Sequence, residues 1–393
     1  MSATPGSSGP GVATAVDATA FAASVRDDAA VWDLRGRLPD SVRRQAASAG
    51  LLGVALPTAY GGAGGSPDDL ARVCVRVGAV CSSLRGLVTV QEMVAAAVLR
   101  WGTPEQRAQW LPPLARGEVF AGFAATEEGA GTALAEVDTR VRDSGGDVLI
   151  TGRKLWITFG QTADVFLVLG KGAGGPLAVL VEGDRPGVHR EPVQGHLGMR
   201  AAGIAHVSFE GVRVPRSHLV GPPGLGLHHI IGTALDHGRF TVAWGCVGMA
   251  EACLDAAAVH AARRTQGGVA LAEHQLVRSV LARAAVDTAA AHALCTRATR
   301  SRAERRPEAV TETVLAKYAA ARTAADVSSG AVRILGATGI APDSLAGRFF
   351  RDAKVMQLIE GSEHVSELHI ADRLLRRHGV RRADGSHPPE AAS

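Results

Sequence analysis

The chain has 393 residues, 46% of them hydrophobic and 20% charged, a balance typical of a soluble globular protein with two or three domains. Lys and Arg number 42 against 38 Asp and Glu, and this formal charge of +4 indicates no basic face of the kind that binds nucleic acid. Only 4% of the residues are aromatic whereas 47 are Gly, so we expect closely spaced helices.

Composition also bears on where the protein is found. No apolar run approaches the length of a membrane-spanning helix, and the N-terminus shows no pattern of a signal peptide. We therefore expect a cytoplasmic protein that contacts neither membrane nor nucleic acid. The cysteines lack metal-binding spacing and are predicted to be buried free thiols. They are Cys74, Cys81, Cys246, Cys253 and Cys295.

The first 24 residues are rich in Ser, Gly, Pro, Ala and Thr, and residues 1–24 are predicted to form a disordered tail. Helical signals follow. One helix is expected from Asp40 to near Gly50. Two further helix starts place a hydroxyl residue directly before Pro, at Ser66 and at Thr103, with an acid or amide three residues after the hydroxyl. An N-terminal helical domain is therefore expected over 25–119.

The pattern changes near residue 120 to short β-rich runs separated by Gly, Asp and Pro. These runs are Val148–Ile150, Val165–Leu169, Leu177–Val181 and Val207–Val214. Long amphipathic patterns then return over 226–262, 272–303, 308–335 and 352–376. The predicted fold is mainly α with an inserted β-domain, a barrel or sandwich over 120–222. A C-terminal four-helix bundle over 223–378 and a loose tail over 379–393 complete the prediction.

Common cofactor and metal signals are absent from the sequence. No Gly-rich stretch follows a strand as G-x-G-x-x-G, and no phosphate-binding loop with Gly-Lys-Ser or Gly-Lys-Thr exists. The 14 histidines show no metal-binding spacing. The Gly-rich stretches are therefore predicted to be turns, and no metal is expected.

The stretch Arg351–Leu375 carries the strongest chemical signal. It is expected to form a short helix, a break at Gly361 and Ser362, and a second helix. The break leaves Glu360 after an apolar run, so its carboxylate should be poorly hydrated. Desolvation raises the pKa of a carboxyl group and suits it to act as a base near neutral pH. Taken alone, Glu360 also fits an ordinary surface position on a helix.

Several segments between about residues 40 and 378 resemble, in order, motifs of the acyl-CoA dehydrogenase family. The matching segments are GFAATEEGAGT (Gly122–Thr132), GRKLWITFGQTAD (Gly152–Asp164), LGMRAAGIAHVSFEGVRVP (Leu197–Pro215), GATG (Gly336–Gly339) and RDAKVMQLIEGS from Arg351. Arg264 and Gln275 keep the spacing of a further family element. The resemblance implies the helical, β and four-helix-bundle domains of that family, and FAD as the cofactor.

The resemblance also implies the flavin contacts. The residues implied to line the isoalloxazine ring are Phe123, Thr126, Trp156 and Thr158. Those implied at the pyrophosphate are Gly131 and Thr132, and those implied to approach the cofactor from elsewhere are Arg264, Gln275, Gly336 and Gly339. Thr158 would donate to the N5 side and Trp156 would shield one face, although Trp156 alone also fits ordinary core packing. Arg264 and Gln275 would reach the flavin of a neighbouring subunit, so a homodimer or homotetramer is expected.

The sequence departs from the family pattern at several of these motifs. Glu128 stands where the family has Pro, Phe159 where it has Asn, and Arg333 where it has Gln. Thr132 replaces Ser and keeps the hydroxyl. Gly267 replaces a Phe that in the family contacts the neighbouring flavin, and the sequence leaves open whether Gly267 and Arg333 weaken FAD binding.

In this family the Glu of the motif removes the α-proton of an acyl thioester. The resemblance therefore implies Glu360 as the catalytic base and Arg239 and Gly361 as substrate-binding residues. Short motifs such as VAWGCVG (Val242–Gly248) and LAK (Leu315–Lys317) further resemble the branch that builds hydroxymalonyl and methoxymalonyl polyketide extender units. That branch implies a small hydroxylated C3 acyl group on an acyl carrier protein. Formation of an enoyl thioester and oxidation of a C3 oxygen function both remain open.

Other functions stay open on the sequence alone. They are a short-chain acyl-CoA dehydrogenase of acyl catabolism, a flavin monooxygenase on the same fold, and a non-catalytic scaffold. Glu360 argues against the monooxygenase, which needs no thioester base. The sequence leaves open the electron acceptor and the choice between a carrier protein and CoA. A carrier protein presents an acidic helix and needs a basic patch. The candidates are Arg302, Arg305 and Arg306, or Arg373, Arg376, Arg377, Arg381 and Arg382.

Overall fold

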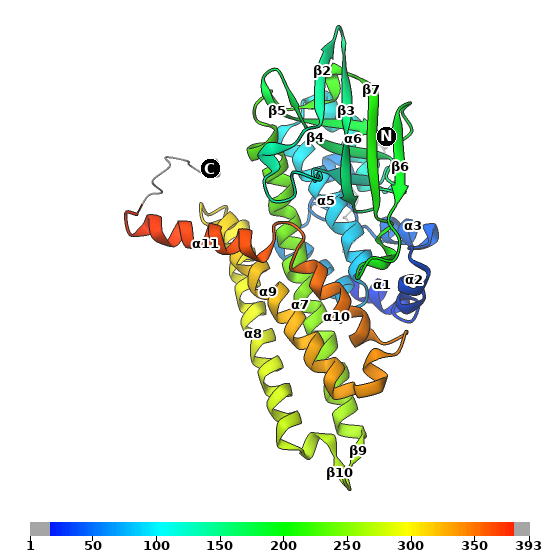
Figure 1. Ribbon diagram of the computed structural model, residues 1–393, viewed down its shortest axis with the longest axis vertical. Coiled ribbons are helices and arrows are strands. Elements are labelled where there is room, and N and C mark those ends of the chain that lie inside the picture. Colours follow the sequence, from blue (N-terminus) through cyan, green and yellow to red (C-terminus); the bar gives the residue numbers. More distant parts are fainter. Residues whose placement is uncertain (1–15, 381–393) are drawn as a thin grey trace, which may run out of the picture.

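The computed structural model describes residues 16–380 of the chain (Figure 1). Its N-terminal part consists of helices, and two of them begin at the capping signals seen in the sequence. Ser66 accepts the Asp69 N–H at the start of α4 (Pro67–Gly78), and Thr103 accepts the Gln106 N–H at the start of α6 (Pro104–Ala115). The remaining helices of this part are α1 (Ala18–Ser24), α2 (Ala29–Arg35), α3 (Asp40–Ser48) and α5 (Ser82–Trp101).

Helix α1 corrects the predicted N-terminal tail. The prediction of disorder over 1–24 is wrong for Ala18–Ser24, where Asp17 caps the helix by accepting the Ala20 N–H at 2.9 Å. Phe21 is buried and α1 packs on α4. Only one large apolar side chain marks this seven-residue helix, so the sequence shows no periodicity. The rest of the tail, residues 1–15, and residues 381–393 of the C-terminal tail lie outside the described residues.

The β-domain is a sheet with the strand order β6-β7-β3-β2-β4-β5-β8, in which β1 also pairs with β4 in parallel. The strands are β1 (Ala121–Ala124), β2 (Arg140–Ser144), β3 (Asp147–Ile157), β4 (Val165–Gly172), β5 (Gly175–Glu182), β6 (Val188–Pro192), β7 (Ala205–Pro215) and β8 (Leu219–Val220). All four predicted β-rich runs lie in strands. The rings of Phe166 on β4 and Phe209 on β7 meet with centroids 6.1 Å apart, although two strands separate β4 from β7 in the sheet. The sheet therefore folds over its own core.

The C-terminal part is a bundle in which α7 and α9 are the central pair (Figure 1). Its long helices are α7 (Gly232–Arg263), preceded by a π-helical turn over Gly226–Ile231, α8 (Gln275–Ala303), α9 (Ala309–Leu335) and α10 (Leu345–Met356). A short hairpin of β9 (Thr265–Gln266) and β10 (Val269–Ala270) joins α7 to α8. The predicted break near Gly361 and Ser362 is confirmed. Helix α10 ends at Met356, a turn follows, and α11 (Glu363–Arg377) is a second helix.

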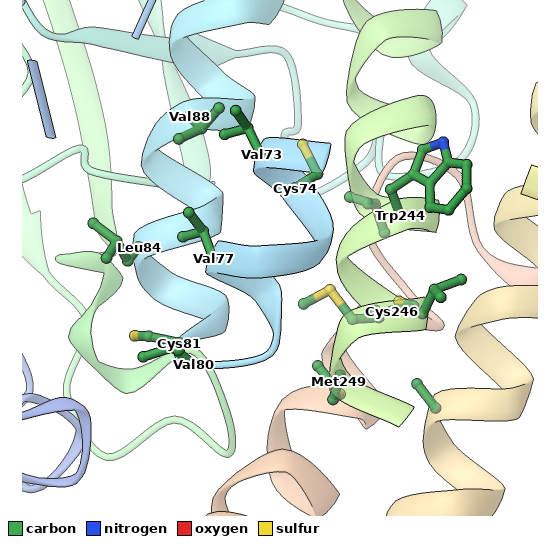
Figure 2. Close-up of a cluster of buried hydrophobic side chains, with 14 of the residues drawn as sticks. Val73, Cys74, Val77, Val80, Cys81, Leu84, Val88, Trp244, Cys246 and Met249 are labelled. Atoms are coloured by element: carbon green, nitrogen blue, oxygen red, sulfur yellow. The ribbon is translucent and has the colours of Figure 1, made fainter. Parts of the chain in front are cut away.

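The expected close helix contacts are present where α4 meets α7. A Cβ on Gly78 would lie 2.6 Å from the Gly245 carbonyl oxygen, and one on Gly248 would lie 2.1 Å from the Val75 carbonyl oxygen. Figure 2 shows buried side chains of α4, α5 and α7 at this contact. All five cysteines are free and buried, as predicted.

One expectation about hydropathy needs correction. By length and composition alone, the segment Gly226–Arg263 could cross a membrane, because it contains an 18-residue stretch with a mean hydropathy of 1.4. Of that stretch, 61% is buried inside the protein. The reason is that α7 packs against α4, α5, α8, α9 and α10 at once, so apolar residues are needed around most of its surface.

Candidate active site

The turn between α10 and α11 places Glu360 against α7. Glu360 and Gly361 both have left-handed backbone, with φ of 56° and 95°, a conformation that is unfavourable for a residue with a Cβ. A Cβ on Gly238 of α7 would lie 2.6 Å from Oε2 of Glu360, so this glycine makes room for the carboxylate. Glu360 Oε2 is buried and has no hydrogen-bond partner among the described residues.

Two cations hold this turn. Arg239 Nε of α7 donates to the Glu360 carbonyl at 2.8 Å, and Lys317 Nζ of α9 donates to the Gly361 carbonyl at 2.7 Å. Burial raises the pKa of Glu360 to about 7, against the opposing effect of Arg239, Lys317 and Arg85. The predicted desolvation of this carboxyl is therefore confirmed. A buried carboxyl that titrates near neutral pH has the property that proton abstraction requires.

Polar side chains continue from this carboxylate into the space between α5 and α7. Thr89 Oγ1 lies 2.9 Å from Thr241 Oγ1, and Thr241 donates to the Gly238 carbonyl. Arg85 is 1% exposed, donates to Thr89 Oγ1 at 2.7 Å and lies 3.1 Å from Met356 Sδ. No described carboxylate lies within ion-pair distance of the Arg85 guanidinium. A buried cation is normally paired, so this one has capacity for an oxygen-rich ligand.

A cavity of about 680 Å³ opens between α5 and α7 beside the Glu360 turn. Arg239 lines it, whereas Glu360 and Gly361 lie next to its wall without forming part of it. Thr132 of the loop after β1 also lines this cavity, so a predicted cofactor residue and a predicted substrate residue face the same space. A second cavity of about 830 Å³ shares Asp236, His237 and Arg302 with the first. The two cavities together lead from the Glu360 turn to the loop between α8 and α9.

Strands β1 and β3 carry the residues predicted to line a flavin ring. Trp156 is 55% exposed, has φ of 59° and meets the His206 ring edge-on with centroids 5.5 Å apart. A large exposed aromatic side chain on unfavourable backbone is typical of a binding surface. Phe123, Thr126 and Thr158 are half-buried, and the two threonine hydroxyls donate to no described residue.

Helix α5 joins this surface to the base. A Cβ on Gly86 would lie 2.7 Å from Met199 Cε and 3.9 Å from Thr158 Cγ2. Gly86 directly follows Arg85, which reaches the polar group near Glu360. The predicted ring-lining residues and the predicted base therefore lie on opposite sides of the same short stretch of α5.

A buried ion pair fixes the loop that carries Thr126, Gly131 and Thr132. Lys154 Nζ of β3 lies 2.6 Å from Glu127 Oε1, and the two side chains are 0% and 8% exposed. Thr139 donates to the same oxygen. Burial pushes the pKa of Glu127 upward, but the hydrogen bonds from Lys154 and Thr139 outweigh it and hold the pKa below its usual value. Gly131 and Thr132 remain exposed beyond this anchor.

A second buried group ties α10, the helix that precedes the Glu360 turn, to the other two domains. Asp352 of α10 accepts the Met199 N–H at 2.6 Å, and Arg351 donates to Leu197 O at 3.2 Å and to Asp33 of α2 at 2.5 Å. A Cβ on Gly198 would lie 2.4 Å from the Arg351 carbonyl. The Arg-Asp-Ala and Leu-Gly-Met-Arg motifs thus meet in space, which explains why both glycine and aspartate are needed there.

The remaining predicted cofactor residues lie at the far end of the bundle. Arg264 follows α7, Gln275 begins α8 and Gly336 follows α9, and all three are exposed. Figure 1 shows the β9–β10 hairpin beside Arg264 at the opposite end of the molecule from the β-domain. The fold therefore does not bring these residues to Trp156 within one chain. Glycine is needed at position 339 for packing within the chain itself, since a Cβ there would lie 2.7 Å from the Val332 carbonyl oxygen.

Gly267, which replaces the Phe of the family pattern, belongs to a tight hairpin turn. Gly267 and Gly268 have φ of 62° and 85° and join β9 to β10. Two-residue hairpins that need positive φ at both positions favour Gly-Gly. The dipeptide between Gln266 and Val269 is the signal that would have predicted this hairpin.

Comparison with known proteins finds a separate match for each of the three parts of the chain. Models of the acyl-CoA dehydrogenase N-terminal, middle and C-terminal domains match residues 14–118, 122–212 and 224–375. The chain belongs to the acyl-CoA dehydrogenase family. Members of the family are FAD-dependent oxidoreductases.

Individual relatives are similar over most of their length. Glutaryl-CoA dehydrogenase of Desulfococcus multivorans is 31% identical over 363 residues, covering 90% of this chain and 92% of the relative. Mouse mitochondrial short-chain specific acyl-CoA dehydrogenase is 30% identical, covering 88% and 85%. The solved structure of FkbI, described as serving biosynthesis of the methoxymalonyl extender unit of the polyketide FK520, has a TM-score of 0.86 and 35% identity, covering 91% of this chain and 99% of FkbI.

The residues on β1 and β3 of this acyl-CoA dehydrogenase fit a flavin. The exposed Trp156 ring offers an apolar face, and the free hydroxyls of Thr126 and Thr158 offer donors. Around Gly131, a Cβ would meet no atom within 4 Å, so the loop is open to a ligand. These residues would hold FAD, and exposed Arg264 would offer a cation to a pyrophosphate on a neighbouring subunit.

Sequence reasoning missed three residues beside the base. Gly238, Lys317 and Arg85 are brought to Glu360 from α7, α9 and α5. Lys317 is the one with a usable local signal, because a lone lysine in the apolar run before Tyr318 marks a buried charge that needs a partner.

Proposed function

We propose that this acyl-CoA dehydrogenase oxidises a small hydroxylated C3 acyl thioester carried by an acyl carrier protein, with Glu360 as the base that removes the α-proton. The observation that carries the substrate class is the buried, unpaired guanidinium of Arg85 with Thr89 and Thr241 near the base. A site for an unsubstituted alkyl chain would present apolar side chains. Arg85, Thr89 and Thr241 line neither of the two cavities, but as polar groups near the base they suit oxygen atoms on a short acyl group that reaches it.

The residues around the turn support the chemistry of Glu360. The α-proton moves to the carboxylate, which the buried site keeps basic, and a hydride leaves the β-carbon. Bound FAD supplies the acceptor for that hydride. Negative charge develops on the thioester oxygen, and the backbone N–H of Glu360, which has no protein acceptor among the described residues, is available to donate to it. Arg239 orients this N–H through the adjacent carbonyl.

The base is tested with Glu360→Gln. The variant should bind FAD like the parent and lose reduction by thioester, because removal of a general base typically costs about 10² to 10⁴ in rate. Glu367→Gln, an exposed position on α11, is the matched control. Flavin absorbance is followed in anaerobic single-turnover mixing without NAD(P)H. Reduction of the flavin in Glu360→Gln at the parent rate would show that another residue is the base.

The substrate class is tested by exchanging the acyl group. A 2,3-dihydroxypropionyl thioester and its C3-aldehyde relative should reduce the flavin faster than a butyryl thioester on the same carrier. Arg85→Met should remove that preference while leaving the unfolding midpoint near that of the parent. A preference for butyryl in the parent would instead support a short-chain acyl-CoA dehydrogenase. A flavin that is reduced only by NAD(P)H and then reacts with O₂ would support the monooxygenase.

The carrier protein is supported by the position of the arginine loop. Arg302 lines both cavities and pairs with Asp236 at 2.5 Å, and Arg305 and Arg306 line the second cavity. The α11 arginines Arg373, Arg376 and Arg377 belong to the helix whose Val365 and His369 line the first cavity, whereas Arg381 and Arg382 lie outside the described residues. The first basic group thus lies at the second cavity, and the second lies further along the helix that borders the first cavity. An acidic carrier helix is the complementary partner.

The carrier is tested by comparing one acyl group on carrier protein and on CoA at low and high salt. Arg305→Glu should lower kcat/KM for the carrier-protein thioester by up to about fivefold, the effect of an exposed ion pair, and the parent value should fall with salt. Arg142→Glu, on exposed β2, is the control. Equal kcat/KM for both carriers without salt dependence would refute the docking proposal. A cytoplasmic location accords with a carrier-protein substrate and stays part of this proposal.

A further inference from the structure

The Glu360 turn has a second anchor that the family chemistry does not assign. Glu360 and Gly361 are consecutive left-handed residues, and only Gly361 adopts that conformation without a Cβ penalty. Arg239 of α7 donates to the Glu360 carbonyl, and Lys317 of α9 donates to the Gly361 carbonyl. Two helices from different parts of the bundle therefore fix one short turn.

Lys317 is an unusual anchor because it is a buried lysine without a carboxylate partner. It is 1% exposed, and Nζ donates to the Gly361 carbonyl at 2.7 Å. The charged and titratable groups that face it are the Cys246 thiol and Arg239 of α7, Glu360 of the turn and Glu363 at the start of α11. None of the described carboxylates lies within ion-pair distance of Nζ. A lysine placed there purely for packing would leave its charge uncompensated.

We propose that Lys317 is a positioning residue for the base, which holds the Glu360–Gly361 turn from α9 and favours the ionised carboxylate of Glu360. The inference rests on the proposed role of Glu360. Arg85 of α5 and Arg239 of α7 are the other cations that face the carboxylate. Burial lowers the pKa of Lys317 to about 8. The ammonium and the carboxylate are therefore both charged only in a narrow range between about pH 7 and pH 8.

The test compares Lys317→Met and Lys317→Arg with Lys171→Met, a control at the half-buried end of β4. Flavin reduction by thioester is measured against pH, and the protonation of Glu360 is followed independently in its infrared carboxyl band with Glu360→Gln as the blank. Lys317→Met should raise the Glu360 midpoint by about one pH unit, since an opposite charge nearby favours the ionised form. Its rate at pH 7 should fall by about fivefold, because the ionised fraction of Glu360 falls from about one half to about one eleventh. FAD content should match the parent.

In the pH profile of the flavin-reduction rate, Lys317→Arg should restore the parent's rise on the acidic side, which reports Glu360. It should remove the fall near pH 8, because a guanidinium does not titrate there. An unchanged midpoint in Lys317→Met, or an alkaline limb that persists in Lys317→Arg, would overturn the proposal. The second variant decides the matter if Lys317→Met fails to fold. Full activity of Glu360→Gln would instead refute the base itself, so the two failures are distinguishable.

Discussion

Gly238 is the residue on which the position of the Glu360 carboxylate depends. A Cβ there would lie 2.6 Å from Oε2 of Glu360 and 2.9 Å from Met93 Sδ. Both atoms are at the far ends of flexible side chains, so the carboxylate and the thioether would have to move aside. Gly238→Ala should therefore displace the base. A misplacement of about 1 Å can cost about 10² in rate, while the FAD content should stay at the parent level.

The measurement for Gly238→Ala is single-turnover flavin reduction together with the flavin-to-protein ratio. Gly146→Ala is the control, because a Cβ at Gly146 would meet no heavy atom within 4 Å. Parent-like reduction by Gly238→Ala would show that the carboxylate does not occupy this position during turnover.

Glu92 of α5 gives the protein a measurable pH dependence of stability. It is 2% exposed, lines the first cavity and accepts the Ala55 N–H at 3.1 Å. Burial raises the pKa of Glu92 from 4.5 to about 7, against the backbone hydrogen bonds from Ala55 and Val54. The folded state thus retains a proton that the unfolded state releases between pH 4.5 and about 7, and stability falls as pH rises through that window.

Glu92→Gln should therefore flatten the pH dependence. The unfolding free energy of the parent should fall by roughly 2 to 3 kcal/mol more than that of the variant between pH 5 and pH 8. Denaturant unfolding at the two pH values measures the difference, with exposed Glu128→Gln as the control. Parallel pH slopes for parent and Glu92→Gln would contradict the assignment.

At the scale of elements, the β1–β2 loop is held to β3 by one buried ion pair. Lys154→Met leaves Glu127 buried and unpaired, a change that typically costs about 3 to 5 kcal/mol. The adjacent pair of Arg153 and Glu191 lies at 2.5 Å but is 52% and 67% exposed, so Arg153→Met should cost less than about 1 kcal/mol. Thermal unfolding and FAD content should both drop for Lys154→Met and not for Arg153→Met. Equal losses of thermal stability and FAD content in the two variants would mean that the buried pair contributes no more than the exposed pair.

At the scale of the whole molecule, the residues predicted to bind the cofactor form two groups at opposite ends of one chain. Trp156, Thr158 and the loop with Thr132 lie on the β-domain side, whereas Arg264 and Gln275 lie at the far end of the bundle (Figure 1). A complete site would then need two subunits. Removing one charge-assisted contact costs about 1.5 to 3 kcal/mol, so Arg264→Ala should weaken FAD binding roughly ten- to a hundredfold.

Subunit mixing tests this arrangement directly. Arg264→Ala and Trp156→Ala should each be poor in FAD alone, whereas a mixed oligomer should regain FAD because one of its sites combines two intact halves. Arg263→Ala, at the neighbouring exposed position, is the control. Flavin absorbance of differently tagged, co-purified subunits is the measurement. Mixed particles that stay without flavin, or Arg264→Ala that keeps parent FAD content and elution volume, would refute the shared site.

The sequence by itself determined features that depend on neighbours along the chain. Helix starts at Ser66 and Thr103 follow from capping, and the turn at Gly361 follows from a glycine after an apolar helix. The desolvation of Glu360 was predicted from the apolar run before it, although in the structure it comes from the packing of the carboxylate against Gly238 of α7. The short α1 was not, because a single buried Phe21 among small residues leaves no period to detect.

Only the tertiary structure decided what surrounds the base. Arg239 and Lys317 reach the turn across 121 and 44 positions of the chain, and Arg85 meets Met356 across 271. No local pattern contains such distances, because they arise when α5, α7 and α9 pack side by side and each presents one residue to the same turn. The roles of Gly238 and Lys317 depend on the atoms that the fold places against them, which belong to Glu360 and Gly361.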